Sequence, residues 1–521
     1  MRTRLQASGF RLQAAARLAV IVLLAGCTRE PPPDPEVITI AMPTSPNNLD
    51  PRVGTDVASA RVHQLIFDNL LTTDENLRVA PGLATRWETP DDLTYVVYLQ
   101  RGVQFHDGHE LTSRDVVHTF ESFLDPTFVS PLKGAFTLLD SVKAIDDYTV
   151  EFRLKQPFGS FPINLVVRIV PAGAGPEVRD HPVGTGPYQF VSMTADDKVV
   201  LKPFPGYFQG PPSNRGVVLK IVPDDIMRGL ELQKGTVDLI VNDLPPDIVW
   251  QLEANPKLQV VTAPGTDYAY VAINMRDPIL KDVRVRRALA YAIDRGAIVE
   301  YLRRGLATAA IGILPPMAWA FETHVPPFAY DPAHARALLD EAGYHDPDGD
   351  GPQPRLRLSL KMSNIEFNRL QGAVIQQNLR EVGIDLDVRS YEFATLYADV
   401  AKGAFQLYTL QWVGVTDPDM LRRVFHSSQV PPVGFNRGHY SNPTVDRLID
   451  EATVSTNIEE RRRRYAEVQR LIAEDAPYIS LWYQTNAAVA QNDLVGLRLL
   501  PNADFGFLRS VRRVPRQATG Q

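Results

Sequence analysis

Two short stretches carry side chains that could bind a metal ion. His106-Asp-Gly-His109-Glu110 holds the only closely spaced histidine pair, but its spacing is not that of a zinc helix, and Asp-Gly is typical of a turn. Asp346-Pro-Asp-Gly-Asp-Gly351 resembles the start of a calcium loop, which needs a glutamate at its twelfth position, where Arg357 stands. Both stretches are therefore predicted to be turns, and no metal or other cofactor is expected.

The sequence contains neither of two common hydrolase motifs, a Gly-x-Ser-x-Gly elbow or a His-Glu-x-x-His helix. Gly184-Thr185-Gly186-Pro-Tyr188 lacks the third glycine and the Gly-Lys-Ser/Thr ending of phosphate-binding loops. We expect it to be a tight turn that brings backbone close to a cleft, either touching a ligand or serving structure alone. The only cysteine, Cys27, ends an apolar leader. No enzyme activity is expected.

The first 26 residues have the pattern of an export signal. Four arginines precede the apolar run Leu18–Leu24, which is far shorter than the roughly 20 residues that span a membrane. Leu24-Ala-Gly-Cys27 resembles the bacterial lipobox, whose cysteine is acylated and becomes the mature N-terminus. Residues 27–36 are rich in proline, which predicts an extended tether. We expect a protein lipid-anchored through Cys27, in the periplasm or on the outer surface; the choice between inner and outer membrane stays open.

Length, composition and charge limit the class of protein and the partners that it can have. It has 521 residues with 44% hydrophobic and 22% charged side chains, typical of a globular protein of two to four domains. The formal net charge is −7, and removal of the arginine-containing leader makes the exported protein more acidic. A nucleic-acid partner is therefore not expected.

The predicted secondary structure changes along the chain after the tether. From Val37 to about Gly265 the signals are strands and hairpins, with one helix beginning at Thr112. From about Tyr268 long helices alternate with single strands, which predicts an α/β lobe with largely parallel pairing. The predicted helices begin at Asp282, Asp331, 366, Asn442 and 458. The strand-rich first part and the helix-rich second part predict two lobes.

Eight motifs in order resemble the family 5 extracellular solute-binding proteins, which include the dipeptide- and oligopeptide-binding lipoproteins of ABC importers. The motifs span most of residues 37–485: Leu49-Asp-Pro51, Phe105-His-Asp-Gly108 with Leu111–Val117, Val183–Tyr188, Tyr270–Asn274, Val283–Arg295, Leu338–Tyr344, Tyr440–Asp446 and Glu474–Tyr483.

This resemblance implies a class II periplasmic-binding-protein fold of the large three-domain type, an α/β fold with two lobes and a hinge of two crossing strands. The expected limits are 37–54, 178–268 and 480–521 for a discontinuous domain I, 55–177 for an inserted domain II, and 269–479 for domain III. Closing lobes would desolvate a small solute and present a distinct shape to a transporter.

The segment Leu410–Met420 carries the ligand prediction. Many peptide-binding relatives have an aspartate three residues after the tryptophan that matches Trp412, where it pairs with the peptide ammonium; here Val415 stands at that position. Because an ammonium in a dry cleft needs an anion, Asp417 or Asp419 would have to substitute, or the ligand has no free amine there. The expected cleft residues are Trp412, Thr416, Asp417, Tyr268, Asn274, Gly184, Thr185, Gly186, Trp482 and Tyr483.

The sequence thus predicts a monomeric lipoprotein that captures a peptide or peptide-like solute and delivers it to the permease of an ABC importer. A solute sensor or adhesion module on the same fold is the alternative. An exported hydrolase is disfavoured, because no nucleophile or metal set is found.

Overall fold

The computed structural model describes residues 34–349 and 351–514. The predicted leader, Cys27 and most of the tether lie outside the described residues. The centre of the protein is an 11-stranded sheet with the order β15-β14-β16-β12-β17-β11-β1-β10-β9-β8, and β13 pairs with β17 off this path. The strands are β1 (Val37–Met42), β8 (Tyr188–Thr194), β9 (Lys198–Pro203), β10 (Gly216–Ile221), β11 (Leu239–Val241), β12 (Leu258–Ile273), β13 (Ala307–Ala309), β14 (Leu356–Ser363), β15 (Ile384–Tyr391), β16 (Leu407–Trp412) and β17 (Tyr478–Gln491).

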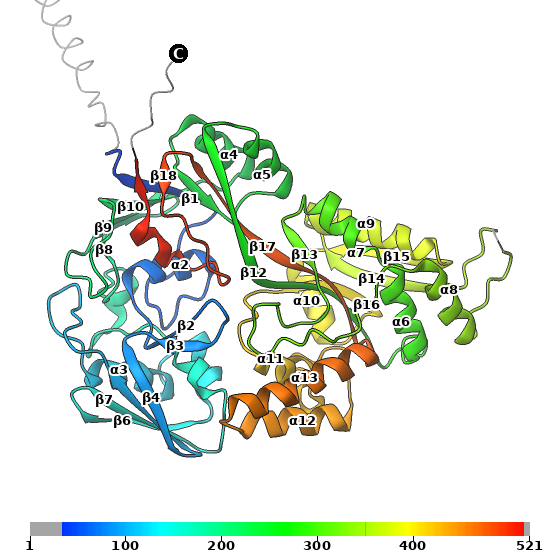
Figure 1. Ribbon diagram of the computed structural model, residues 1–521, viewed down its shortest axis with the longest axis horizontal. Coiled ribbons are helices and arrows are strands. Elements are labelled where there is room, and N and C mark those ends of the chain that lie inside the picture. Colours follow the sequence, from blue (N-terminus) through cyan, green and yellow to red (C-terminus); the bar gives the residue numbers. More distant parts are fainter. Residues whose placement is uncertain (1–33, 350, 515–521) are drawn as a thin grey trace, which may run out of the picture.

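The long antiparallel strands β12 and β17 belong to both lobes (Figure 1). Their pairing is regular on the side of β11, is interrupted between Pro264 and Tyr268, and resumes on the side of β16. The interruption stands where the two strands pass from one lobe to the other. The predicted hinge of two crossing strands is confirmed.

The first lobe contains a core built from β1, β9, β10, β11 and a C-terminal segment that folds back onto them. Helix α2 packs in this cluster through Val62 and Leu65, although the predicted limit between domains I and II assigns this helix to domain II. That limit stays a prediction. The other elements of this part are α2 (Val57–Ile66), α4 (Asp225–Lys234), α5 (Pro246–Glu253), β18 (Leu494–Val495), η6 (Phe505–Ser510) and β19 (Arg512–Arg513).

A separate four-stranded sheet, ordered β4-β5-β7-β6, forms the rest of this lobe with its own apolar core. One of the predicted hairpins is present as β6 and β7. Helix α3 begins at the predicted Thr112 with a capping box, in which Asp115 accepts a hydrogen bond from the Thr112 amide at 2.7 Å. The elements are β2 (Leu71–Thr73), β3 (Val79–Pro81), β4 (Ala84–Asp91), β5 (Thr94–Leu99), α3 (Ser113–Leu124), η1 (Pro131–Phe136), β6 (Leu139–Asp146), β7 (Thr149–Leu154), η2 (Phe161–Leu165) and η3 (Pro176–Arg179).

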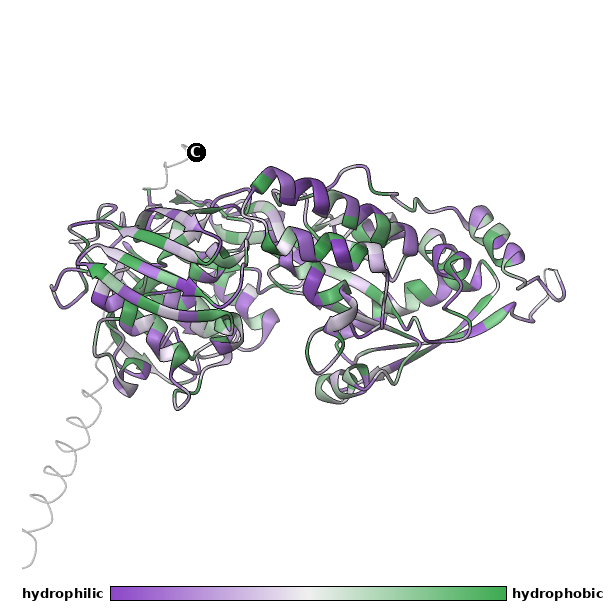
Figure 2. Cartoon of the chain, turned by 90° about the horizontal axis from the view of Figure 1, so that it is seen from below, coloured by the Kyte–Doolittle hydropathy of each residue, from purple (hydrophilic) through white to green (hydrophobic). Residues whose placement is uncertain are grey.

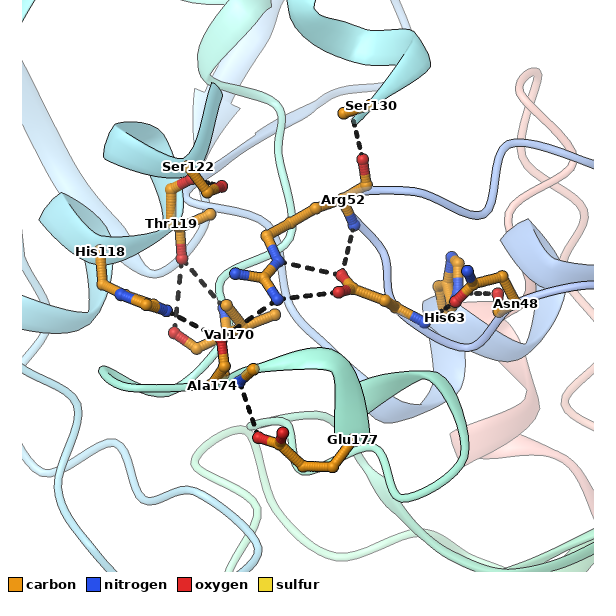
Figure 3. A network of polar contacts seen from close by, with 12 residues as sticks. Asn48, Arg52, His63, His118, Thr119, Ser122, Ser130, Val170, Ala174 and Glu177 are labelled. Carbon is orange, nitrogen blue, oxygen red and sulfur yellow. Dashed lines mark hydrogen bonds and ion pairs between the residues drawn. The ribbon is translucent and has the colours of Figure 1, made fainter. Parts of the chain in front are cut away.

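A buried polar network joins these two parts of the first lobe (Figure 3). Asp50 and Arg52 form an ion pair at 2.8 Å, with side-chain exposures of only 6% and 3%. Arg52 also donates to the Ala174 carbonyl, and its own carbonyl accepts from Ser130 at 2.5 Å. The imidazole of His118 lies 3.1 Å from the same Ala174 carbonyl. The Leu49-Asp-Pro51 motif therefore connects strand β1 to the second sheet.

The second lobe covers both faces of the β12–β17 sheet with helices. One core cluster contains Tyr268 and Tyr483, and the other contains Trp482, because neighbouring residues of a strand point to opposite faces. The helices are α6 (Val283–Ala292), α7 (Arg295–Ala297), η4 (Ile298–Leu302), α8 (Pro332–Glu341), α9 (Glu366–Arg380), α10 (Phe393–Ala401), α11 (Asp419–Phe425), η5 (Ser427–Gln429), α12 (Pro443–Val454) and α13 (Ile458–Asp475).

The predicted parallel pairing of this lobe is only partly right. Strand β14 is parallel to β15 and β16, but β12 is antiparallel to both β16 and β17. The reason is the hinge: β12 carries the chain into the lobe and β17 carries it out. Along the helices, bands of hydrophilic and hydrophobic residues alternate (Figure 2), as expected where one face packs on a core.

Candidate functional site

The predicted aromatic residues of the hinge are held by contacts inside the second lobe. Tyr268 is only 1% exposed, and its hydroxyl lies 2.7 Å from the Ser480 hydroxyl. The Tyr483 hydroxyl donates to the Gly312 carbonyl at 2.6 Å. The Trp482 indole N–H donates to Gln371 at 2.9 Å on the opposite face of the sheet. These contacts give the three side chains a structural role, and their predicted contact with a ligand stays a prediction.

Trp412 is half-buried at the end of β16, directly across from Tyr268 in the sheet register. Its ring stacks on Tyr270 with 6.1 Å between the centroids, and the Arg437 guanidinium lies 5.2 Å from its ring. The Trp412 indole nitrogen is buried without a hydrogen-bond partner among the described residues. The Asn274 side chain, in contrast, has a partner: it donates to the Phe405 carbonyl at 2.9 Å and so holds the loop that leads into β16.

The loop after Trp412 contains the residues that could bind the ammonium group of a ligand, and their surroundings differ. Val415 is 1% exposed, and its amide donates to Thr266 on the hinge strand at 3.1 Å. Asp419 is paired with Arg422 at 2.9 Å. Asp417 has no cation within 4 Å in the described chain; it accepts hydrogen bonds from the Asp419 amide and, at 3.4 Å, from Ser160 of the first lobe. Burial raises the pKa of Asp417 to about 6, against the opposing effect of Arg461. Thr416 beside it is half-buried.

The turn Gly184–Gly186 packs tightly against the end of α2. A Cβ on Gly184 would lie 2.1 Å from the Ile66 carbonyl oxygen, and one on Gly186 would lie 2.6 Å from the Ile66 carbonyl carbon. Both positions therefore require glycine. Between them, the Thr185 hydroxyl donates to Asp68 at 2.9 Å. The turn thus orients a carboxylate of the cavity described next.

A cavity of about 560 Å³ lies beside the hinge, and we call it the hinge cavity. Its walls come from the end of α2, the β2–β3 hairpin, the Val166–Arg168 segment and the C-terminal segment 496–510. Leu500 of this wall accepts a hydrogen bond from Asn486 of β17 at 2.9 Å, so the cavity is one contact away from the hinge strand. Its volume suits a solute of a few residues.

The hinge cavity holds charges of both signs. The Arg168 Nε is buried without a hydrogen-bond partner, and no carboxylate oxygen lies within 4 Å of its guanidinium in the described residues. Asp68 accepts from Tyr207 and Thr185, both at 2.9 Å. Burial raises the pKa of Asp68 to about 6, and it also raises the pKa of Asp504. Arg509 lines the same wall.

These charged residues were absent from the predicted site. One signal pointed to Arg168, because a charged residue interrupts the apolar run Val166–Val170. Asp68 and Asp504 offered no such signal. They come together only because the C-terminal segment returns to the first lobe.

A second cavity, of about 370 Å³, lies between the lobes and is named here the Ser160 cavity. Trp87 and Ser160 line it from the first lobe, and Trp319, Asp417 and Arg461 line it from the second. Of the predicted residues, Asp417 therefore reaches the boundary between the lobes. The predicted carrier architecture requires such a boundary beside the Trp412 loop.

Comparison with known proteins decides the family. The model for bacterial extracellular solute-binding proteins, family 5, matches residues 78–430. The chain belongs to this family. It is 31% identical over 485 residues to the glutathione-binding protein GsiB of Pectobacterium atrosepticum, covering 90% of this chain and 92% of that one. The predicted family is confirmed.

Solved structures agree with this family 5 assignment. The oligopeptide-binding protein AppA of Bacillus subtilis, solved with a nonapeptide, has a TM-score of 0.73 and 28% identity, covering 92% of this chain and 99% of that one. The ABC transporter-associated periplasmic binding protein DppA of Helicobacter pylori, solved with the peptide STSA, has a TM-score of 0.74 and 25% identity, covering 92% and 98%. The predicted class II fold is confirmed.

No helix within 34–349 or 351–514 is long and apolar enough to cross a bilayer. In the same ranges no three histidine, cysteine or acidic side chains are grouped to hold a metal ion.

Proposed function

We propose that this protein is the substrate-binding lipoprotein of an ABC importer and that it holds a peptide or peptide-like solute in the hinge cavity. The observation that carries the proposal is the placement of this charged cavity one hydrogen bond from the strand that joins the lobes. Relatives named for oligopeptide and glutathione binding support the solute class. The DppA structure supports the link to an ABC transporter.

The charges of the cavity favour a zwitterion. Arg168 has a buried Nε without a hydrogen-bond partner and forms no ion pair within 4 Å in the described residues, so a solute carboxylate would satisfy it. Asp68 and Asp504 line the same cavity and can accept hydrogen bonds from an ammonium group. A short peptide carries both groups, separated by a few ångströms of backbone.

The predicted residues of the second lobe complete the proposal. Trp412 and Thr416 do not line the hinge cavity, and their contact with a solute stays a prediction; Asp417 would add negative charge at the boundary between the lobes. Of the two predicted substitutes for the missing anchor at Val415, Asp417 is favoured, because Asp419 is already paired with Arg422.

The proposals for the membrane anchor and the domain limits are those predicted from the sequence. We propose that Cys27 carries the lipid, that residues 27–36 hold the body away from the membrane, and that the mature protein acts as a monomer. We further propose the three domains with the limits given above and reversible binding without covalent chemistry.

The test uses residues 28–521 expressed without the leader. Native mass spectrometry of the purified protein should reveal a trapped solute of peptide mass. Titration with trialanine and with glutathione should raise the melting temperature, and blocking either terminus of trialanine should weaken binding. If a panel of free peptides produces no shift while a sugar or a metal chelate does, the peptide proposal is wrong.

A further inference from the structure

One turn of the first lobe inserts between two helices of the second. The Gly159 amide donates to the Thr453 carbonyl at the end of α12 at 2.7 Å. In return, Arg461 of α13 donates to the Gly159 carbonyl at 3.0 Å and to the Ser160 hydroxyl. Backbone and side chain of a single turn thus contact both helices.

Sterics restrict this contact to glycine. A Cβ on Gly159 would lie 1.8 Å from the Ser455 carbonyl oxygen and 3.4 Å from the Thr453 carbonyl oxygen. Since the first distance is far below any van der Waals contact, a side chain at this position would force the two lobes apart. The turn itself is anchored in its own lobe, because the Tyr95 hydroxyl donates to the Phe158 carbonyl at 3.0 Å.

Arg461 depends on the other lobe for its hydrogen bonds. Its side chain packs on Trp319, with the guanidinium 5.2 Å from the ring, and the residue is only 6% exposed. No carboxylate lies within 4 Å of it in the described residues, and its Nε has no partner there. A buried guanidinium without acceptors is costly. The acceptors offered by Gly159 and Ser160 therefore favour the closed arrangement.

A second contact crosses the boundary nearby. Leu77, at the tip of the β2–β3 hairpin, is 2% exposed and belongs to the same apolar cluster as Tyr268 and Tyr465 of the second lobe. Asp74 shapes this tip by accepting from the Asn76 and Arg78 amides, both at 2.8 Å. The same hairpin lines the hinge cavity, so closure at Leu77 also covers the proposed solute.

We propose that the Phe158–Ser160 turn is a latch that holds the lobes closed over the solute, with Arg461 as its positioning residue. The proposal rests on the proposed function for the need to close, but none of the latch residues lines the hinge cavity. The latch therefore acts on the lifetime of the closed form and is independent of which solute is bound.

The test compares Gly159→Ala with Gly134→Ala in residues 28–521. Gly134 lies in the same domain, and a Cβ added there would have no other atom within 4 Å, so it is a matched control. Stopped-flow tryptophan fluorescence with trialanine or glutathione should show solute leaving Gly159→Ala about 10-fold faster or more, because one lost interlobe contact of ~1.4 kcal/mol gives a factor of ten. Trp87 and Trp319 beside the latch supply the signal.

A second measurement does not need a solute. Residues 28–521 contain no cysteine, so dyes can be attached at Val129→Cys and Ile365→Cys, two exposed positions on different lobes. Gly159→Ala should shift the interdye distance toward the open form, and Gly134→Ala should not. Equal dissociation rates for Gly159→Ala and the parent protein would overturn the latch. If the parent binds no peptide, the proposed function fails, and identical distance distributions would then overturn the latch separately.

Discussion

The contact between the two parts of the first lobe differs in kind from the contact between the lobes. The first is built on the Asp50–Arg52 ion pair, which is almost fully buried and hydrogen-bonded on several sides (Figure 3). The second uses the Phe158–Ser160 turn, Arg461 and Leu77, together with the exposed Arg304–Asp247 pair, and it has no buried ion pair among the described residues.

This difference has a physical consequence. Separating Asp50 from Arg52 would leave charges in an apolar interior, so the first contact is expected to persist whenever the protein is folded. Opening the second contact exposes backbone groups and a guanidinium that water can solvate. The molecule thus combines a permanent junction with a reversible one, which is what a closing carrier needs.

The strongest way to break the permanent junction is Asp50→Ala. It leaves Arg52 buried without its carboxylate, and we expect a loss of about 3–5 kcal/mol in the free energy of unfolding. Urea denaturation followed by circular dichroism measures it. A loss under about 1 kcal/mol, the range of exposed ion pairs, would show that the junction is not the rigid element described here.

Arg168→Met sharpens the contrast between stability and binding. Removing an unsatisfied guanidinium should leave the unfolding free energy unchanged or slightly raised, whereas trialanine affinity should fall about 10- to 100-fold, since a charge-assisted hydrogen bond contributes about 1.5–3 kcal/mol. Calorimetric titration checks the affinity. Unchanged affinity would place the solute carboxylate elsewhere.

Lowering the pH should weaken solute binding in the hinge cavity. Because burial raises the pKa of Asp68 to about 6, this carboxyl is ionised at pH 7 and neutral at pH 5. Trialanine should bind roughly tenfold more weakly at pH 5. The stability contribution has the opposite sign: it is fully present below the ordinary pKa of 3.8 and is lost as the pH rises through about 6.

The variant Asp68→Asn tests whether Asp68 causes the pH dependence of trialanine binding. The variant should bind trialanine with an affinity that changes little between pH 5 and 7, apart from the contribution of Asp417, whose pKa is raised to about 6 as well. A full pH dependence in Asp68→Asn, abolished in Asp417→Asn, would move the ammonium site to the boundary between the lobes.

The smallest effect is expected at the surface pair of Arg357 and Asp385, whose side chains are 77% and 57% exposed at 3.2 Å. Asp385→Ala should change the unfolding free energy by less than about 0.5 kcal/mol. The same urea measurement gives the reference against which Asp50→Ala is judged. A loss comparable to that of Asp50→Ala would remove the distinction between buried and exposed pairs.

Local structure and family membership were predictable from the amino-acid sequence. Helix starts at Thr112, Asp282, Asp331 and Asn442 were predictable because capping signals act within three or four residues. The ordered motifs were sufficient to indicate the fold and the two crossing strands.

The side chains that line a common cavity could be identified only in the folded protein. Asp68, Arg168 and Asp504 lie far apart in the sequence; a strand bridge between Asn69 and Arg168 and the return of the C-terminal segment bring them to one cavity. Trp482 and Tyr483 are neighbours in sequence but point to opposite faces of one strand. Contacts of this kind depend on long-range packing, which no local pattern of residues encodes.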